Sequence, residues 1–286
     1  MIIWLTSYPK SGNTWVRSFL SSLMFTENGE ADFEALKNIH QYPLRSNFEG
    51  LVQNLDDLNI LSENWINSQD LMNLDKKIKF LKTHHVMCNF GKYSFTNYEN
   101  TFGVIHIVRD PRNIITSLLS YFSKKDYNEA KKFIFDENKI IGFTHDLNRQ
   151  NNLKDNNIIT LISSWKTHFN SWKNFKKNYL LIKYENLIQN PDSEFDKIRY
   201  YLKNKLNLSF SDEKFKNAII SNSFSNLKEL EKTKGFSENL ISNNTKKKVN
   251  FFNLGPNNDY KNLLDTETKQ EIEKFFYSEM KELEYI

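Results

Sequence analysis

The sequence predicts an α/β fold in which a central parallel β-sheet is flanked by helices on both faces. Short apolar runs typical of buried strands alternate along the chain with segments of helical spacing. Polar clusters directly follow the apolar runs, and in such folds ligands bind at the carboxyl ends of the strands. No repeat or low-complexity linker interrupts the 286 residues, so we expect a single domain over 1–286.

The first strand is predicted at 2–5, where β-branched and aromatic residues suit a buried strand. A polar turn at 10–14 follows it, and apolar residues at helical spacing between Trp15 and Leu23 indicate an amphipathic helix. A strand, a glycine-bearing turn and a helix together aim backbone N–H groups and a helix dipole at one anion. We therefore expect an anion site at this turn, although many such units are ordinary βα connections.

Three more strands are predicted, at 78–83, 101–108 and 179–183, and the middle one is apolar enough for the centre of a parallel sheet. It is followed by Asp110 and Pro111, which favour the N-cap and first position of a helix that continues to 122. Further helices are predicted at 163–172, 192–202, 211–220 and 266–283. Short helices and loops are expected at 27–77, one or two surface helices at 124–153, and a mobile segment at 232–262.

Composition argues against several classes of protein. A net charge of +4 lacks the strong basic bias of a protein that binds nucleic acid. No apolar run approaches the roughly 18–20 residues of a membrane span, and no basic segment precedes the first strand, so we expect neither a span nor a signal peptide. Cys88, the only cysteine, excludes an internal disulfide and suits a reducing compartment. We expect a cytoplasmic protein.

The segment SYPKSGNTW, directly after the first strand, resembles the loop that binds the 5′-phosphosulfate in sulfotransferases using 3′-phosphoadenosine 5′-phosphosulfate (PAPS), whose usual form is YPKSGTTW. Asn13 replaces a threonine of that loop. The resemblance implies a P-loop-like fold, in which Lys10 stabilises the leaving 5′-phosphate. It also implies that the amides of Ser11, Gly12, Asn13, Thr14 and Trp15 bind phosphate oxygens and that Trp15 stacks on adenine. A tryptophan packed in the core is the alternative for Trp15.

Lys82-Thr83-His84, at the end of the second predicted strand, resembles the KTH element of the cytosolic sulfotransferases. The resemblance implies that His84 is the catalytic base and that Lys82 stabilises the transferring group. A lone histidine is by itself more often structural than catalytic. His85 should point elsewhere, because neighbouring side chains alternate on an extended backbone. His168 matches a family histidine near the acceptor, and a histidine packed on a helix explains it nearly as well.

The block VRDPRNIITS resembles the family segment in which an arginine and a serine eight residues later bind the 3′-phosphate of the nucleotide; these are Arg109 and Ser117 here. Without that resemblance, an ion pair between Arg109 and Asp110 is an equally good explanation. Arg112 is an additional basic candidate, although a position at the surface is the expected one. Tyr184 in KYEN matches a tyrosine that contacts the adenosine half. Asn222 and Phe224 match a segment that holds the adenine, with Phe224 as the second face of the stack.

The resemblance weakens at 251–261, where the family usually has a segment like FxRKGxxGDWK. Gly255 keeps its register as a nucleotide-binding residue, but Asn253-Leu254 replaces the arginine and lysine. The resemblance implies that this segment closes over the 3′-phosphate of the nucleotide. Each cation that is lost therefore removes a charge-assisted hydrogen bond to that phosphate, worth roughly 1.5–3 kcal/mol. The three consecutive lysines at 246–248 either replace the missing arginine and lysine or belong to a solvated loop. We expect 232–262 to act as a mobile lid over the nucleotide.

We therefore expect a sulfotransferase that moves the sulfuryl group of PAPS to a hydroxyl or amine of a small-molecule or carbohydrate acceptor and releases adenosine 3′,5′-bisphosphate (PAP). No metal-binding motif is visible, so we expect no metal ion. One alternative is a non-catalytic nucleotide-binding relative. A less favoured one is a P-loop kinase, which would need the absent GK[ST] and an aspartate for Mg²⁺. The sequence leaves the acceptor and the oligomeric state open.

Overall fold

The structure, a computed structural model, describes residues 1–122, 127–142, 158–241 and 248–286. It divides into two compact units, each assembled from three stretches of chain. Unit 1 comprises Met1–Tyr8, Ile39–His106 and Phe135–Leu181, and unit 2 comprises Pro9–Asn38, Ile107–Ile134 and Ile182–Ile286. The organisation of 1–286 as a single domain stays a prediction.

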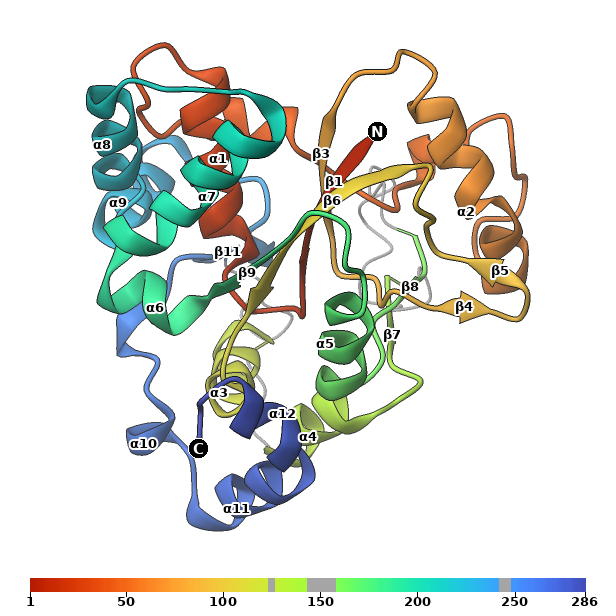
Figure 1. Cartoon of the computed structure of the whole chain (residues 1–286). Coiled ribbons are helices and arrows are strands. Elements are labelled where there is room, and N and C mark those ends of the chain that lie inside the picture. The colour runs from red at the N-terminus through yellow and green to blue at the C-terminus, as the bar shows by residue number, and fades with distance from the viewer. Residues whose placement is uncertain (123–126, 143–157, 242–247) are drawn as a thin grey trace. The chain divides into compact units, whose positions relative to one another are not determined.

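A five-stranded parallel sheet flanked by helices confirms the predicted fold class (Figure 1). Its strand order is β2-β3-β1-β6-β9, with β1 at Ile2–Ser7, β2 at His40–Gln41, β3 at Lys79–Thr83, β6 at Thr101–Val108 and β9 at Tyr179–Lys183. The four predicted strands are all present. The sequence missed β2, because two residues are too short to show an alternating pattern; they pair with Leu81 and Lys82 of β3.

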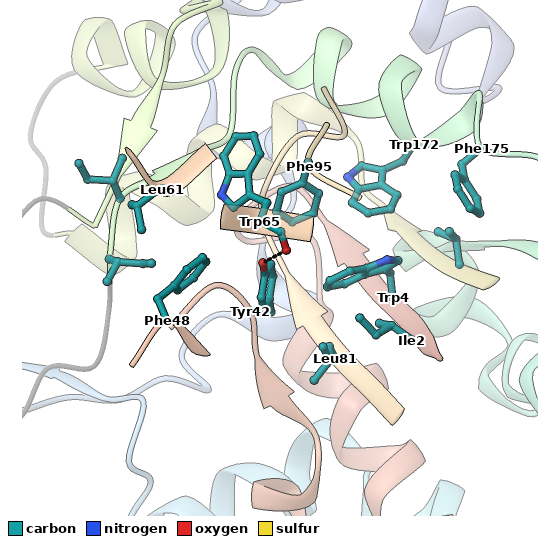
Figure 2. Packing of buried hydrophobic residues seen from close by; sticks show 13 residues of the cluster. Ile2, Trp4, Tyr42, Phe48, Leu61, Trp65, Leu81, Phe95, Trp172 and Phe175 are labelled. Atoms are coloured by element: carbon teal, nitrogen blue, oxygen red, sulfur yellow. Dashed lines mark hydrogen bonds between the residues drawn. The ribbon is translucent and has the colours of Figure 1, made fainter. Parts of the chain in front are cut away.

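An aromatic core fills unit 1 (Figure 2). Trp4 of β1 lies among Tyr42, Phe95 and Trp172, with ring centroids 5.4–6.1 Å away, and its indole N–H donates to Thr101 Oγ1 at 2.9 Å. Trp65 is also buried in this core. Every residue of β1 is buried, which explains why its sequence is apolar throughout rather than alternating.

The remaining elements of unit 1 pack on this core. The 15-residue helix α2, Leu58–Met72, begins at the N-cap Asp57, whose side chain accepts from Asn59 N, and α5, Trp165–Lys173, begins at the N-cap Ser164. Two short antiparallel pairs are added: β4 (Asn89–Phe90) with β5 (Tyr93–Ser94), and β7 (Ile140–Ile141) with β8 (Thr160–Leu161). The 3-10 turn Arg45–Asn47 completes the unit.

Unit 2 is largely helical. Its helices are α1 Asn13–Phe25, α3 Pro111–Phe122, α4 Tyr127–Phe135, α6 Tyr184–Gln189, α7 Pro191–Leu206, α8 Asp212–Ser221, α9 Phe224–Lys234, α10 Tyr260–Leu263, α11 Thr266–Phe275 and α12 Tyr277–Glu282, of which α4 ends one residue into unit 1. The side chain of the N-cap residue accepts a backbone hydrogen bond at the start of α7, α8, α9, α10 and α11. Figure 1 shows α1, α7, α8 and α9 gathered together. The single helix predicted at 266–283 is wrong: Phe276, which is fully buried, separates α11 from α12.

The segment predicted as a lid is partly structured. It contains the antiparallel pair β10 (Leu240–Ile241) and β11 (Lys248–Val249), the 3-10 turn Gly255–Asn257 and α10. Residues 242–247, including Lys246 and Lys247, lie outside the described residues, as do 123–126 and 143–157 of the region predicted as surface helices. Across the part of the chain that the structure describes, no helix combines the length and apolarity needed to cross a membrane.

Candidate active site

The turn after β1 has a backbone that only particular residues adopt. Lys10 and Gly12 both have positive φ, 69° and 93°. Gly12 is the N-cap of α1, and a Cβ at this position would lie 2.4 Å from the Tyr184 ring. A glycine is therefore required here both by its conformation and by the approach of that ring. Ser11 Oγ is buried and has no hydrogen-bond partner within the described parts of the chain.

Arg109 contacts both the turn after β1 and the Tyr184 ring. It follows the last residue of β6, and its Nη1 donates to the Lys10 carbonyl at 2.8 Å. Its guanidinium lies over the Tyr184 ring, 4.1 Å from the centroid, a favourable cation–π geometry. Arg109 is 5% exposed, and its Nε has no hydrogen-bond partner among the residues described. Lys10, Arg109 and Tyr184, which lie far apart in the sequence, thus form one cluster in unit 2.

Aromatic side chains continue from this cluster. Trp15 is half-buried and packs edge-on against Tyr184 at 5.9 Å and Phe195 at 6.0 Å between ring centroids. The Lys10 ammonium lies 4.9 Å from the centroid of Phe251. Trp15 and Phe251 both pack on the second apolar cluster, formed by Leu36, Leu227, Phe236 and Phe252.

Phe224 and Gly255, both predicted to hold the nucleotide, are in direct contact. Phe224 is the first residue of α9 and packs on the same apolar cluster. A Cβ on Gly255, whose φ is 52°, would lie 2.3 Å from the Phe224 ring. The structure therefore brings together two residues separated by 31 positions in the sequence.

Two predicted nucleotide residues, Asn222 and Thr14, hydrogen-bond other side chains of the protein. Asn222 is fully buried, and its Nδ2 donates to Ser22 Oγ at 2.9 Å and to the Ala218 carbonyl at 2.8 Å, which links α8 to α1. Thr14 Oγ1 donates to Glu238 Oε2 at 3.3 Å. Ser117 is half-buried on α3, and Asn13 is the first residue of α1.

Arg112 is not at the surface, so this prediction is wrong. It is 3% exposed and forms a bidentate ion pair with Asp110, which also caps α3 by accepting from Arg112 N at 2.9 Å. It further pairs with Glu273 and stacks on the Tyr260 ring at 4.0 Å. The capping roles of Asp110 and Pro111 are as predicted. The alternative ion pair of Arg109 with Asp110 is not found, since Asp110 pairs with Arg112 and Arg109 donates to the backbone carbonyl of Lys10.

In unit 1 the ring of His84 is held by β1. Its Nδ1 lies 2.7 Å from the Ser7 carbonyl and 3.3 Å from Ser7 Oγ. A carbonyl can only accept, so Nδ1 carries the proton of the neutral ring and Nε2 carries the lone pair. His84 is half-buried, whereas Lys82 on β3 is 7% exposed.

Three further histidines of unit 1, His85, His106 and His168, are buried, and their lowered pKa values keep them uncharged at neutral pH. His85 stacks on Phe95 with 4.0 Å between centroids, as the predicted alternation of side chains requires, and burial lowers its pKa to about 3. Burial also lowers the pKa of His106 to about 3 and that of His168 well below its usual value. His168 packs edge-on against Tyr8 at 5.6 Å and hydrogen-bonds the backbone of His84. Of these four histidines, His84 is the one that remains half-buried.

Several contacts of the site had no signal in the sequence. Ser7 orients His84, Glu238 binds Thr14 and forms an ion pair with Arg17, and Glu185 accepts from Asp110 N at 2.9 Å. These polar residues lie at the end of β1, in a loop after α9 and at the start of α6, where no sequence pattern marks them, so only spatial proximity reveals them. The described residues hold no group of three His, Cys, Asp or Glu side chains suited to a metal ion. Independence from metal stays a prediction.

Comparison with known proteins places this arrangement in a family. The model of the sulfotransferase domain matches residues 2–284. Among solved structures, mouse sulfotransferase SULT7A1 complexed with PAP is 18% identical with a TM-score of 0.58, covering 98% of this chain and 84% of that one. Retinol dehydratase with retinol and PAP is 14% identical with a TM-score of 0.59, covering 98% and 81%; a second complex of it holds androsterone and PAP.

The search of curated proteins finds no match. At such low identity the solved structures establish a shared fold, and the family match over nearly the whole chain establishes more. The chain belongs to the sulfotransferase domain family and is a PAPS-dependent sulfotransferase.

Proposed function

We propose that the enzyme transfers the sulfuryl group of PAPS to a hydroxyl or amine of a small acceptor, with His84 as the base. The observation that carries the proposal is the cluster in unit 2 in which the Arg109 guanidinium donates to the Lys10 carbonyl and lies over the Tyr184 ring, while the Lys10 ammonium lies 4.9 Å from the Phe251 centroid. An anionic adenine nucleotide complements such a set of groups.

Unsatisfied donors support the same ligand. Ser11 Oγ, Arg109 Nε and the Trp15 indole nitrogen are buried without a hydrogen-bond partner in the described chain. A buried polar group without a partner costs roughly 1–3 kcal/mol, so a ligand rich in acceptor oxygens would repay this cost. The PAPS molecule carries such oxygens on its phosphosulfate and on its 3′-phosphate.

Each predicted nucleotide residue has a proposed role. Lys10 and the loop residues Ser11, Gly12, Asn13, Thr14 and Trp15 bind the 5′-phosphosulfate. Arg109, Ser117 and Gly255 bind the 3′-phosphate, while Tyr184, Asn222 and Phe224 contact the adenosine. The engaged amide of Asn222 leaves only its Oδ1, which is buried without a hydrogen bond to any described residue, for this purpose.

The proposed reaction is an in-line displacement at sulfur. The acceptor oxygen forms a bond to sulfur as the bond from sulfur to the 5′-phosphate oxygen breaks, and the acceptor proton passes to His84 Nε2. The Ser7 carbonyl, at 2.7 Å from Nδ1, stabilises the imidazolium that forms. Lys10 stabilises the negative charge on the leaving PAP, and Lys82 stabilises the transferring group.

Calorimetric titration tests the donor. PAP, ATP and adenosine 5′-monophosphate (AMP) are titrated with and without Mg²⁺ into the wild type and into Lys10→Ala and Arg109→Ala. Selective, metal-independent binding of PAP that needs both residues supports the proposal. Mg²⁺-dependent binding of ATP without preference for the 3′-phosphate contradicts it and favours the kinase alternative. Failure to bind any of the three nucleotides indicates that the replacement of the arginine and lysine by Asn253-Leu254 has abolished binding of the PAPS donor.

Transfer from radiolabelled PAPS tests the base. Small alcohols are the first acceptor class to screen, since the retinol dehydratase complexes hold retinol and androsterone. We expect His84→Ala to lower kcat by about 10²–10⁴-fold, because a positioned base contributes that much. The matched control is His40→Gln, which changes an exposed histidine of the same unit. Equal activity of His84→Ala and His40→Gln would rule out His84 as the base.

A further inference from the structure

Four residues of unit 2 close a ring of hydrogen bonds at the ends of β6 and β9. Glu185 Oε1 accepts from Asp110 N at 2.9 Å, and Glu185 Oε2 accepts from the Tyr285 hydroxyl at 3.0 Å. Arg112 Nη2 donates to the Tyr285 carbonyl at 2.8 Å and to Asp110 Oδ2 at 2.6 Å, which completes the ring. The C-terminal segment is thereby attached to two strand ends at once.

The ring adjoins the nucleotide cluster through the backbone. Asp110 directly follows Arg109, and Glu185 directly follows Tyr184. The bond from Asp110 N to Glu185 therefore fixes the separation of the two segments that place the Arg109 guanidinium 4.1 Å from the Tyr184 centroid. Any loosening of Glu185 would be transmitted to this stacked pair.

Burial makes the ring sensitive to the loss of one bond. Asp110 and Arg112 are each 3% exposed. Burial raises the pKa of the Glu185 carboxyl, and it raises the pKa of Tyr285 well above its usual value, an effect to which the neighbouring Glu185 charge adds. The Tyr285 hydroxyl therefore keeps its proton at neutral pH and remains a donor. A buried carboxylate is stabilised by its hydrogen-bond donors, so the loss of one donor destabilises the Glu185 side chain in its observed position.

We propose that Tyr285 is a positioning residue for the nucleotide, which holds Arg109 and Tyr184 in place through Glu185 and Asp110. The proposal rests on the proposed function, because it takes PAP as the ligand of Arg109 and Tyr184. Its physical basis is preorganisation: a binding group held in its bound geometry loses less conformational freedom when the ligand arrives.

The test compares two nucleotides on two tyrosine variants. Tyr285→Phe removes only the hydroxyl that binds Glu185, and Tyr277→Phe is the control because Tyr277 lies nearby in the sequence but is 55% exposed. Calorimetry measures PAP and AMP on each variant. We expect Tyr285→Phe to weaken PAP binding about five- to tenfold and AMP binding at most about twofold, since AMP lacks the 3′-phosphate that Arg109 receives. Tyr277→Phe should leave both affinities unchanged.

The outcomes separate this inference from the proposed function. Wild type that shows no preference for PAP over AMP refutes the proposed function and this inference with it. Wild type that prefers PAP, with Tyr285→Phe unaltered or weakened equally for both nucleotides, overturns the positioning role alone. Equal weakening with a lower Tm indicates a purely structural role.

A second variant keeps the test decisive if Tyr285→Phe does not fold. Glu185→Gln retains the shape of the side chain but replaces one carboxylate oxygen by an NH2 donor. In the observed geometry, where Asp110 N and the Tyr285 hydroxyl each donate to a different oxygen, one of the two bonds is therefore lost. It should shift PAP affinity in the same direction, again with little change for AMP. Unchanged PAP affinity in Glu185→Gln also contradicts the proposal.

Discussion

At the scale of single residues, Gly12 carries two constraints at once. Its φ of 93° suits only glycine, and the Tyr184 ring occupies the space where a Cβ would lie. The same ring stacks on the Arg109 guanidinium. The close approach of loop and ring is therefore part of what holds the cluster together, and glycine is the residue that permits it.

Gly12→Ala separates these two constraints. Gly50 also has a positive φ, 78°, but no heavy atom lies within 4 Å of a Cβ built there. Gly50→Ala should cost about 1–2 kcal/mol for the left-handed conformation alone. We expect Gly12→Ala to cost more than Gly50→Ala in urea unfolding and also to weaken PAP binding, because Tyr184 must move. Equal free energies of unfolding and normal PAP affinity would show that the ring gives way without cost.

At the scale of elements, the ion pair of Glu238 with Arg17 joins α1 to the segment that follows α9. Arg17 is 5% exposed, and Glu238 also accepts from Thr14. A buried cation that loses its partner is destabilising. The ion pair therefore helps to hold α1, which begins after the turn that contains Lys10 and Gly12.

Removing this carboxylate charge should destabilise the protein. We expect Glu238→Gln to lower the free energy of unfolding by about 1–3 kcal/mol, since Arg17 then keeps only a neutral partner in a buried place. The control is Glu229→Gln, whose carboxylate is 63% exposed and pairs with exposed Lys232 at 3.5 Å. Urea unfolding of both variants decides the matter. A loss as small as that of Glu229→Gln would mean that solvent compensates Arg17.

Predictability from sequence differs between elements for physical reasons. Strands with long apolar runs and helices with a cap and a periodic face, such as β6 and α3, were predicted closely. The strand β2 was missed because two residues carry no period, and the break at Phe276 was missed because a buried aromatic there fits a continuous helix equally well. Local signals thus fail where tertiary packing decides.

At the scale of the whole molecule, the order of the site blocks along the chain could be predicted, and their polar partners could not. The resemblance named Lys10, Arg109 and Tyr184, which the structure brings together. Arg112 was misplaced at the surface because a charged residue on a helix is usually solvated. Its partners Glu273 and Tyr285 are more than 160 positions away, and no periodic pattern marks them.

Stability of the whole molecule should depend on pH through its buried histidines. The pKa values of His85 and His106 are held at about 3 by burial, against about 6.5 in an unfolded chain. Between these values the unfolded state binds more protons. The free energy of unfolding should therefore fall as pH drops from about 6.5 toward 3, by up to about 1.4 kcal/mol per pH unit for each histidine.

The variant His85→Phe isolates one of these contributions. Phenylalanine can keep the stack on Phe95 but cannot take up a proton. Urea unfolding between pH 4 and 7 should show a slope smaller by about one proton than that of the wild type. Glu185, whose pKa is raised by burial, contributes the opposite slope, losing stability as pH rises through its pKa; this contribution is common to both proteins and cancels. Identical slopes would mean that His85 takes up its proton at the same pH in the folded and the unfolded state.

The placement of the tryptophans allows intrinsic fluorescence to report on one part of the protein. Of its five tryptophans, Trp4, Trp65, Trp165 and Trp172 are at most 2% exposed, whereas Trp15 is half-buried beside the Tyr184 ring. Fluorescence quenched by acrylamide should therefore come chiefly from Trp15. A nucleotide that covers this indole would protect it from the quencher, so binding to the turn after β1 can be followed by emitted light without any attached label.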